Sequence, residues 1–148
     1  MKKIMFVCTG NTCRSPMAEY ILKDLLKKEG IEDIKVTSAG IMCEEEGINP
    51  KAKNALKNHG ITVRRNKTHP ATADLCRKQN AIICMTQAHK NKFVGFSNVY
   101  TVDELTGLGD IPDPFGKDQS AYDECAKTIM KACVKIKELL TDSGRRQE

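Results

Sequence analysis

The sequence predicts an α/β protein in which helices cover both faces of a mostly parallel sheet. Four short segments have the composition of strands, stretches with helical spacing lie between them, and no internal repeat or linker interrupts the chain. This alternation is typical of three-layer folds with a parallel sheet. At 148 residues the chain has the length of one domain. We expect residues 1–148 to form that domain, with 141–148 as a frayed tail.

The chain opens with a predicted strand and helix. Residues 4–7 (IMFV) are a continuous apolar run, as expected of a central strand that is covered on both faces. A helix is predicted from Pro16, with Ser15 as its N-cap, because apolar residues recur at helical spacing until Gly30.

The remaining elements continue the alternation. In chain order they are a strand at 33–40, a helix at 49–60, a helix at 72–79, a strand at 81–85, a helix at 86–94, a strand at 98–102, a loop rich in Gly and Pro at 103–117 and a helix at 119–140. In such a fold, ligands bind beyond the carboxyl ends of the strands, and Cys8 lies where the first strand ends.

Composition and charge exclude several classes of protein. The net charge of +5 is modest, and aromatic residues make up 5% of the chain, unlike a nucleic-acid interface that interleaves basic and aromatic side chains. No apolar run reaches the roughly 18 residues of a membrane span. The start MKKIMFVCTGN has the basic residues of a signal peptide, but the apolar run that follows them, residues 4–7, is too short for one. We therefore expect a cytoplasmic protein that binds neither nucleic acid nor a membrane.

The seven cysteines argue against a secreted disulfide scaffold, because their number is odd and the chain is long for that class. No pair has C-x-x-C spacing, and no histidine lies beside a cysteine cluster at zinc spacing, so we expect no metal site. Most of these thiols are then expected to be buried apolar groups.

The stretch VCTGNTCRSPMAE (7–19) places Cys8 and Arg14 at C-x-x-x-x-x-R spacing between the first strand and the first helix. Gly10 and Asn11 tolerate unusual backbone angles, so this loop can turn its N–H groups inward as an anion nest. The helix N-terminus and the guanidinium of Arg14 add positive charge. The loop is therefore predicted to bind one tetrahedral dianion.

The same charges favour the thiolate form of Cys8, which is the nucleophilic form. The motif thus predicts covalent phosphoryl transfer to sulfur. The alternative interpretation is a buried cysteine beside an arginine that caps the helix.

A leaving group needs a proton, and the best acid lies in GDIPDPFG (109–116). Asp113 stands between Pro112 and Pro114, which restrict the backbone and so fix where its carboxyl group points. Phe115 can form an apolar wall beside it. Asp110 is interpreted as a solvated or turn-forming residue.

Two motifs, VCTGNTCRSPMAE and DPFG (113–116), resemble those of the low-molecular-weight protein tyrosine phosphatase family. SAG (38–40), NHGI (58–61) and ICMT (83–86) fall at compatible intervals, so the resemblance spans nearly the whole chain. It implies the phosphatase I-like fold, a four-stranded parallel sheet flanked by helices, with no metal or organic cofactor. It also implies phosphorylated proteins as substrates and a monomeric enzyme.

The resemblance also implies a role for each motif residue. Cys8 is the nucleophile, Arg14 clamps the phosphate, and Asp113 protonates the leaving group and then activates water. Thr9, Gly10, Thr12 and Cys13 form the phosphate-binding loop, with Phe115 at the substrate. Asn11 and Ser15 match positions that hold the loop and support the thiolate by hydrogen bonds. Cys13 matches a second cysteine that forms a reversible disulfide with the nucleophile.

The sequence departs from the tyrosine-specific pattern of the family. Thr12 replaces a branched apolar residue, Gly116 follows Phe115 where a second aromatic is usual, and the loop 41–47 carries no aromatic residue. Thr12 followed by Cys13, together with MTQAHK (85–90) and DPFG, resembles the bacterial protein-arginine phosphatases of the family. A hydroxyl on the pocket wall suits a polar guanidinium, or the attacking water, better than it suits an aryl ring. Phosphoarginine is the favoured substrate and phosphotyrosine the alternative.

Another departure concerns the support of the loop. The family has a histidine a few residues after the HGI segment, whereas this chain has Arg64 and Arg65 there and His69 further on. The sequence does not say which of them takes its place.

Two other functions remain open at this point. Arsenate reductases of the same fold pass oxidation to two further cysteines near the third strand. Cys84 lies there, but the next cysteine is Cys125 on the last helix. Alternatively, the loop binds phosphate without turnover, or the Cys8–Cys13 pair is only a redox switch.

Overall fold

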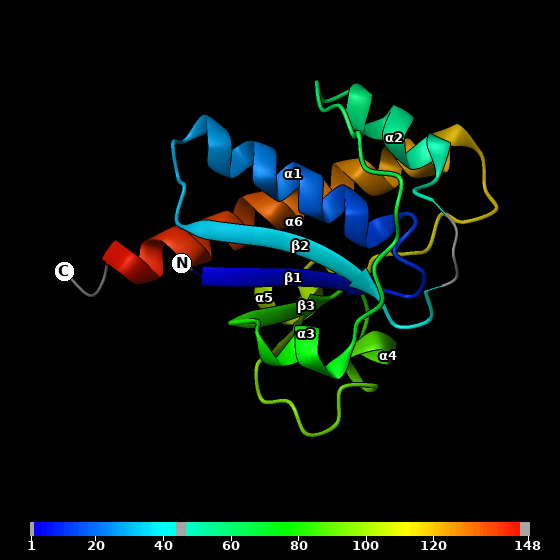
Figure 1. Cartoon of the computed structure of the whole chain (residues 1–148). Coiled ribbons are helices and arrows are strands. Elements are labelled where there is room, and N and C mark those ends of the chain that lie inside the picture. Colours follow the sequence, from blue (N-terminus) through cyan, green and yellow to red (C-terminus); the bar gives the residue numbers. More distant parts are fainter. Residues whose placement is uncertain (1, 44–46, 146–148) are drawn as a thin grey trace.

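The computed structural model describes residues 2–43 and 47–145, with the backbone alone for 142–145. Four parallel strands form one sheet in the order β2-β1-β3-β4 (Figure 1). They are β1 (Lys2–Cys8), β2 (Ile34–Gly40), β3 (Ala81–Cys84) and β4 (Val99–Thr101). The predicted four-stranded parallel sheet is confirmed.

Helices cover both faces of this sheet. One face carries α1 (Arg14–Lys28), α2 (Pro50–Lys57), α5 (Val102–Thr106) and α6 (Gln119–Arg145). The other carries α3 (Ala73–Arg77) and α4 (Gln87–Lys90), with a smaller core beneath them (Figure 1). None of these helices, over the part of the chain that the structure describes, is long and apolar enough to cross a membrane.

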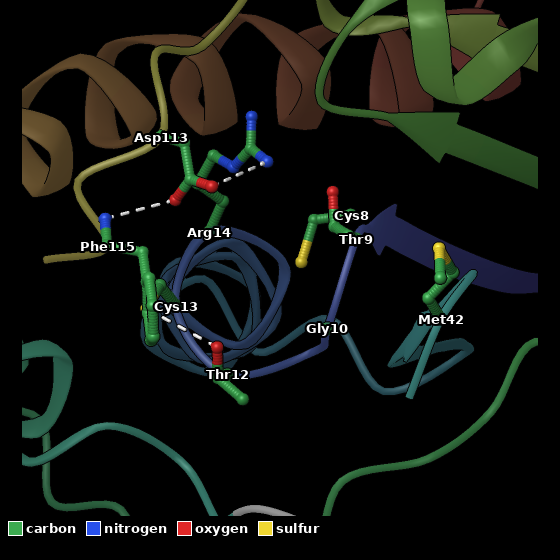
Figure 2. Close-up of a pocket in the computed structure, with 9 residues that line it drawn as sticks. All are labelled: Cys8, Thr9, Gly10, Thr12, Cys13, Arg14, Met42, Asp113 and Phe115. Atoms are coloured by element: carbon green, nitrogen blue, oxygen red, sulfur yellow. Dashed lines mark hydrogen bonds and ion pairs between the residues drawn. The ribbon is translucent and has the colours of Figure 1, made fainter. Parts of the chain in front are cut away.

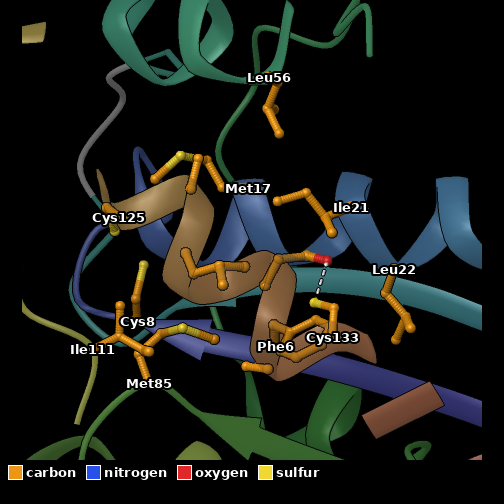
Figure 3. Packing of buried hydrophobic residues seen from close by; sticks show 14 of the residues in the cluster. Phe6, Cys8, Met17, Ile21, Leu22, Leu56, Met85, Ile111, Cys125 and Cys133 are labelled. Atoms are coloured by element: carbon orange, nitrogen blue, oxygen red, sulfur yellow. Dashed lines mark hydrogen bonds between the residues drawn. The ribbon is translucent and has the colours of Figure 1, made fainter. Parts of the chain in front are cut away.

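Strand β1 lies in the centre of the sheet and is buried on both faces. Ile4 and Phe6 point into the larger core beneath α1 and α6, while Met5 and Val7 point into the smaller one. Figure 3 shows α6 packed against α1, with Cys133 turned into the larger core. Because successive side chains of a strand alternate between faces, only a continuous apolar run satisfies both cores.

The start of α1 differs from the sequence-based expectation. The helix begins at Arg14, and its N-cap, Cys13, makes no side-chain cap hydrogen bond. The prediction of Ser15 as N-cap was therefore wrong. Its hydroxyl instead contacts Cys8 and Asn11 in the preceding loop.

The loop predicted at 103–117 also contains a helix. Thr101 and Glu104 form a capping box that starts α5, and Gly107 ends it in the left-handed conformation with φ 73°. Both signals are present in the sequence TVDELTG (101–107) but were missed. At the other end, α6 continues to Arg145, so 141–145 is helical rather than frayed, and 146–148 lie outside the described residues.

Candidate active site

The loop between β1 and α1 begins at Cys8, whose side chain is buried. Its Sγ lies 2.9 Å from the hydroxyl oxygen of Ser15, and either atom can donate this hydrogen bond. Asn11, at the top of the loop, has a positive φ of 58°, a conformation that asparagine tolerates better than most residues. This angle turns the chain sharply enough to bring Ser15 back beside Cys8.

The carbonyl groups of this loop point outward. The carbonyl oxygens of Cys8, Thr9 and Thr12 accept hydrogen bonds of 3.0, 2.8 and 2.9 Å from backbone N–H groups of neighbouring segments. These donors belong to Ile41, Met42 and Asn49.

The peptide bonds here are trans, so each following N–H points the opposite way from its carbonyl. The N–H groups of 9–13 donate no hydrogen bond to any described residue. The predicted anion nest is consistent with this geometry.

A pocket of about 250 Å³ opens above the loop (Figure 2). Eight of the predicted site residues line it, and Met42, which the sequence did not suggest, forms part of its wall. Of the described residues, those that line it are Cys8, Thr9, Gly10, Thr12, Cys13, Arg14, Met42, Asp113 and Phe115. The two remaining predicted residues, Asn11 and Ser15, are fully buried and do not line the pocket.

Arg14 is 5% exposed and holds its guanidinium against the pocket wall. Its Nη1 donates to the carbonyl oxygen of Ile111 at 2.9 Å, and its Nη2 lies 3.5 Å from Oδ2 of Asp113. Its Nε is buried and has no partner among the described residues. An unpaired buried N–H is costly, and an anionic oxygen in the pocket would satisfy it.

Asp113 reaches the pocket from the loop after α5, opposite Cys8 in Figure 2. Its side chain is half-exposed, and Oδ1 accepts a hydrogen bond of 3.1 Å from the backbone N–H of Phe115. Phe115 itself is 59% exposed at the rim. Asp110 is exposed, as predicted for a solvated residue, and its Oδ1 accepts from the N–H of Gln87 at the start of α4.

Cys13 lines the pocket beside Cys8 but has its own hydrogen-bond partners. Its Sγ lies 3.3 Å from the hydroxyl of Tyr122 and 3.5 Å from that of Thr12. Burial raises the pKa of the Cys13 thiol, and this outweighs the opposing effect of the two hydroxyls. We therefore expect Cys13 to remain a thiol at neutral pH.

His89, which the sequence analysis did not place in the site, contacts the loop from α4. Its side chain is buried, with Nε2 2.9 Å from the Thr9 hydroxyl and Nδ1 3.0 Å from that of Thr86. Burial, reinforced by the charge of Arg14, lowers the pKa of His89 to about 4. The ring is therefore neutral at physiological pH, and it orients the Thr9 hydroxyl at the pocket wall.

Gly40, the last residue of β2, lies directly behind the loop. A Cβ atom at this position would come within 2.8 Å of the Gly10 carbonyl carbon and the Thr9 oxygen, and within 2.9 Å of the Asn11 nitrogen. All three are backbone atoms of the loop, so no side-chain rotation relieves the contact. Only glycine allows this close approach.

Replacing Gly40 by alanine should therefore displace the loop and impair the enzyme more than the fold. We expect kcat/KM for p-nitrophenyl phosphate to fall about 100-fold and the free energy of unfolding to fall by about 1–3 kcal/mol. Steady-state kinetics and denaturant unfolding measure the two effects. Gly30→Ala is the control for activity: its positive φ of 68° strains the backbone at a helix end away from the loop, so stability should fall while kcat/KM stays unchanged. Activity of the Gly40→Ala protein within threefold of the parent would contradict the steric argument.

The geometry argues against the relay that arsenate reduction requires. Cys84 is fully buried in the smaller core, whereas Cys125 is buried in the larger core on the other face of the sheet. Burial raises the pKa of each thiol to about 12, which leaves both protonated and unreactive. These two cysteines are packing residues.

Among the described residues, no group of three or more His, Cys, Asp or Glu side chains is arranged to hold a metal ion. Among the described lining residues, the polar side chains are two thiols, two hydroxyls, a guanidinium and one carboxylate. This set suits an anionic substrate that carries a group able to accept a proton.

Comparisons with known proteins agree with the fold. The family model described as low molecular weight phosphotyrosine protein phosphatase matches residues 3–146. The protein-arginine-phosphatase of Bacillus subtilis (strain 168) is 38% identical over 127 residues, 80% of this chain and 83% of the relative. The low molecular weight protein-tyrosine-phosphatase PtpB of Staphylococcus epidermidis is 34% identical over 143 residues, 91% of this chain and 96% of the relative.

A solved structure of the YwlE arginine phosphatase, a cysteine-to-serine mutant with a phosphorylated active-site serine, superposes with a TM-score of 0.88. It is 33% identical, and the match covers 99% of both chains. With a family model that spans almost the entire sequence, the chain belongs to the low molecular weight phosphotyrosine protein phosphatase family.

Proposed function

We propose that this protein removes the phosphoryl group from phosphorylated protein side chains through a phosphocysteine at Cys8. One observation carries the proposal: the Cys8 thiol and the unpaired guanidinium Nε of Arg14 share a pocket whose floor is a loop with outward carbonyls. The loop N–H groups and Arg14 bind the phosphoryl oxygens, and the thiolate lies beneath phosphorus.

In the first step, Cys8 Sγ attacks phosphorus and the bond from phosphorus to the leaving nitrogen or oxygen breaks. Asp113 gives its proton to that leaving atom as the bond breaks. In the second step, Asp113 takes a proton from a water molecule, which attacks phosphorus and expels the Cys8 thiolate with release of inorganic phosphate. The half-exposed position of Asp113 at the rim suits both steps, because it faces the leaving group and solvent.

Phosphoarginine is the substrate that we favour. The pocket wall carries the hydroxyls of Thr9 and Thr12, and its one aromatic residue among the described lining residues, Phe115, is mostly exposed. Hydroxyl oxygens can accept hydrogen bonds from a guanidinium, whereas an aryl ring offers them no donor. The relative that is named a protein-arginine-phosphatase supports the same preference.

A direct comparison of two substrates tests this preference. We expect higher kcat/KM on a peptide with phosphoarginine than on the same peptide with phosphotyrosine. The Thr12→Val variant keeps the shape of the side chain but lacks the hydroxyl, and should shift the ratio toward phosphotyrosine about tenfold. Thr12→Ser, which retains the hydroxyl, is the control.

Phosphotyrosine is the second candidate, supported by the PtpB relative, which matches a larger share of the chain. If kcat/KM is higher on the phosphotyrosine peptide, and the ratio of the two kcat/KM values is unchanged in Thr12→Val, phosphotyrosine is the substrate instead.

We further propose a cytoplasmic, monomeric enzyme. The seven cysteines are free thiols, which is typical of a reducing compartment. The large exposed apolar side chains of the described residues are scattered, and two of them, Met42 and Phe115, belong to the pocket rim. The disulfide between Cys8 and Cys13 remains a prediction, to be tested by mass spectrometry of a peptide digest after peroxide treatment.

A further inference from the structure

A buried polar network lies behind the catalytic loop, with Arg65 at its centre. Arg65 belongs to the segment between α2 and α3, and its side chain is 17% exposed. Its Nη1 donates to Oε1 of Glu19 at 2.7 Å and its Nη2 to Oδ1 of Asn11 at 3.1 Å, while Nε donates to the carbonyl of Lys67. The planar fork thus joins α1 to the loop, which a single ammonium could not do.

Glu19 anchors this fork. Its side chain is 2% exposed, and a buried carboxylate is tolerated only when partners satisfy its charge. Oε1 accepts from Arg65 and from the hydroxyl of Ser38 at 2.5 Å, and Oε2 accepts from Lys23 at 2.5 Å. Since the carboxylate only accepts, Ser38 must donate its proton to Glu19.

The side-chain amide of Asn11 links this network to the loop, and the donors around it fix which way the amide points. Its Oδ1 faces two obligatory donors, Arg65 Nη2 and the backbone N–H of His69, at 3.1 and 2.9 Å. The amide nitrogen must therefore point the other way, where Nδ2 lies 2.9 Å from the hydroxyl oxygens of Ser15 and Ser38. Both serine oxygens accept from this amide.

Ser15 completes the chain of hydrogen bonds. Because its oxygen accepts from Asn11, its own proton is left to donate. Two acceptors lie within reach, Cys8 Sγ at 2.9 Å and the carbonyl oxygen of Ala39 at 3.4 Å. The shorter contact makes the sulfur the recipient, and a thiolate is the stronger acceptor of the two.

We propose that Arg65 is a positioning residue that, together with the backbone N–H of His69, fixes the direction of this hydrogen-bond chain, so that Ser15 donates to the Cys8 thiolate. Arginine has no acceptor and keeps its charge at all physiological pH values, so the direction cannot reverse at its origin. The inference rests on the proposed function, in which Cys8 is the nucleophile. It assigns to Arg65 the loop support that the sequence left open among three residues.

The experiment compares Arg65→Met and Arg65→Lys with Arg64→Met, the matched control. Arg64 is the exposed neighbour in the same segment. For both Arg65 variants we expect kcat to fall about tenfold with KM changed less than about threefold, because the phosphate contacts remain in place. Arg64→Met should match the parent. Arg65→Lys keeps a positive charge beside the buried carboxylate of Glu19. It therefore tests the role of Arg65 even if Arg65→Met does not fold.

A double-mutant cycle with Ser15→Ala separates positioning from general stability. If Arg65 acts through Ser15, Arg65→Lys should have little further effect on kcat once Ser15 is alanine. Multiplied effects in the double variant, or an unchanged kcat in Arg65→Lys alone, would overturn the inference.

The rate of Cys8 alkylation by iodoacetamide, followed by peptide mapping, repeats the cycle without any turnover. It should slow in the Arg65 variants and show the same non-additivity. If the parent protein hydrolysed no phosphorylated substrate while alkylation followed this pattern, the proposed function would fail and the role of Arg65 would stand.

Discussion

Replacing Cys8 by serine is expected to abolish turnover of p-nitrophenyl phosphate, with a loss of about 10⁴-fold to 10⁶-fold in kcat. A serine hydroxyl does not ionise near neutral pH, so the helix N-terminus and the guanidinium of Arg14 have no anion to stabilise at that position. Release of p-nitrophenol, followed in the steady state, measures the effect. Cys43→Ser is the matched control, because Cys43 is a half-buried thiol in the neighbouring segment that does not line the pocket.

The same variant distinguishes catalysis from simple phosphate binding. The loop N–H groups and Arg14 remain, so inorganic phosphate should still bind to Cys8→Ser and raise its melting temperature. Because the serine hydroxyl is a weaker nucleophile at the same position, we expect at most slow phosphorylation of the introduced serine by substrate, visible by intact-protein mass spectrometry. Undiminished turnover would instead show that Cys8 is not the nucleophile, and a parent protein that binds phosphate without turnover would be a binding module.

The fold could be predicted because its signals are local. The run at residues 4–7 is apolar throughout since β1 is buried on both faces, and Gly30 ends the first helix as glycines commonly do. The loop from Cys8 to Arg14 could be predicted for the same reason. Within one short segment it carries the thiol, the turn residues and the cation, and the strand and helix on either side fix its position.

The supporting residues could not be predicted, because their roles depend on contacts between distant segments. Arg65 reaches Asn11 across 54 positions of the chain, and His89 reaches Thr9 across 80. Neither arginine in the pair 64–65 is marked by its own sequence context, and only the packed structure shows that Arg65 is partly buried and Arg64 exposed. Met42 is similar, since it reaches the pocket through pairing of the segment after β2 with the loop.

The incorrect N-cap has a related cause. Ser-Pro before an apolar helix usually indicates a capping serine, but here the hydroxyl of Ser15 has stronger partners in Asn11 and Cys8. At this position the hydrogen bonds of the site determine the side-chain conformation and override the local preference for an N-cap. Such exceptions to local propensity are expected at functional sites.

Replacing Arg14 by lysine should reduce kcat/KM about 100-fold to 1000-fold, the second largest effect that we expect in this protein. Three nitrogens of the guanidinium have separate tasks. One is held by the Ile111 carbonyl, one lies beside Asp113, and Nε is left unpaired at the pocket. A single ammonium cannot meet the fixed carbonyl and two phosphoryl oxygens at once, so it loses the planar contact that tightens as phosphorus is transferred.

The measurement is the kinetics of a phosphorylated peptide together with the inhibition constant of vanadate, an oxyanion that resembles the transferred group. In Arg14→Lys, kcat/KM should fall and the inhibition constant of vanadate should rise. The inhibition constant of vanadate should change in closer proportion to kcat/KM than the inhibition constant of inorganic phosphate does. The reason is that the guanidinium contributes binding that is stronger in the transition state than in the ground state. Arg77→Lys, at an exposed ion pair on α3, is the matched control. Loss of phosphate binding without loss of kcat would mean that Arg14 only captures substrate, and the clamp would then take no part in the chemical step.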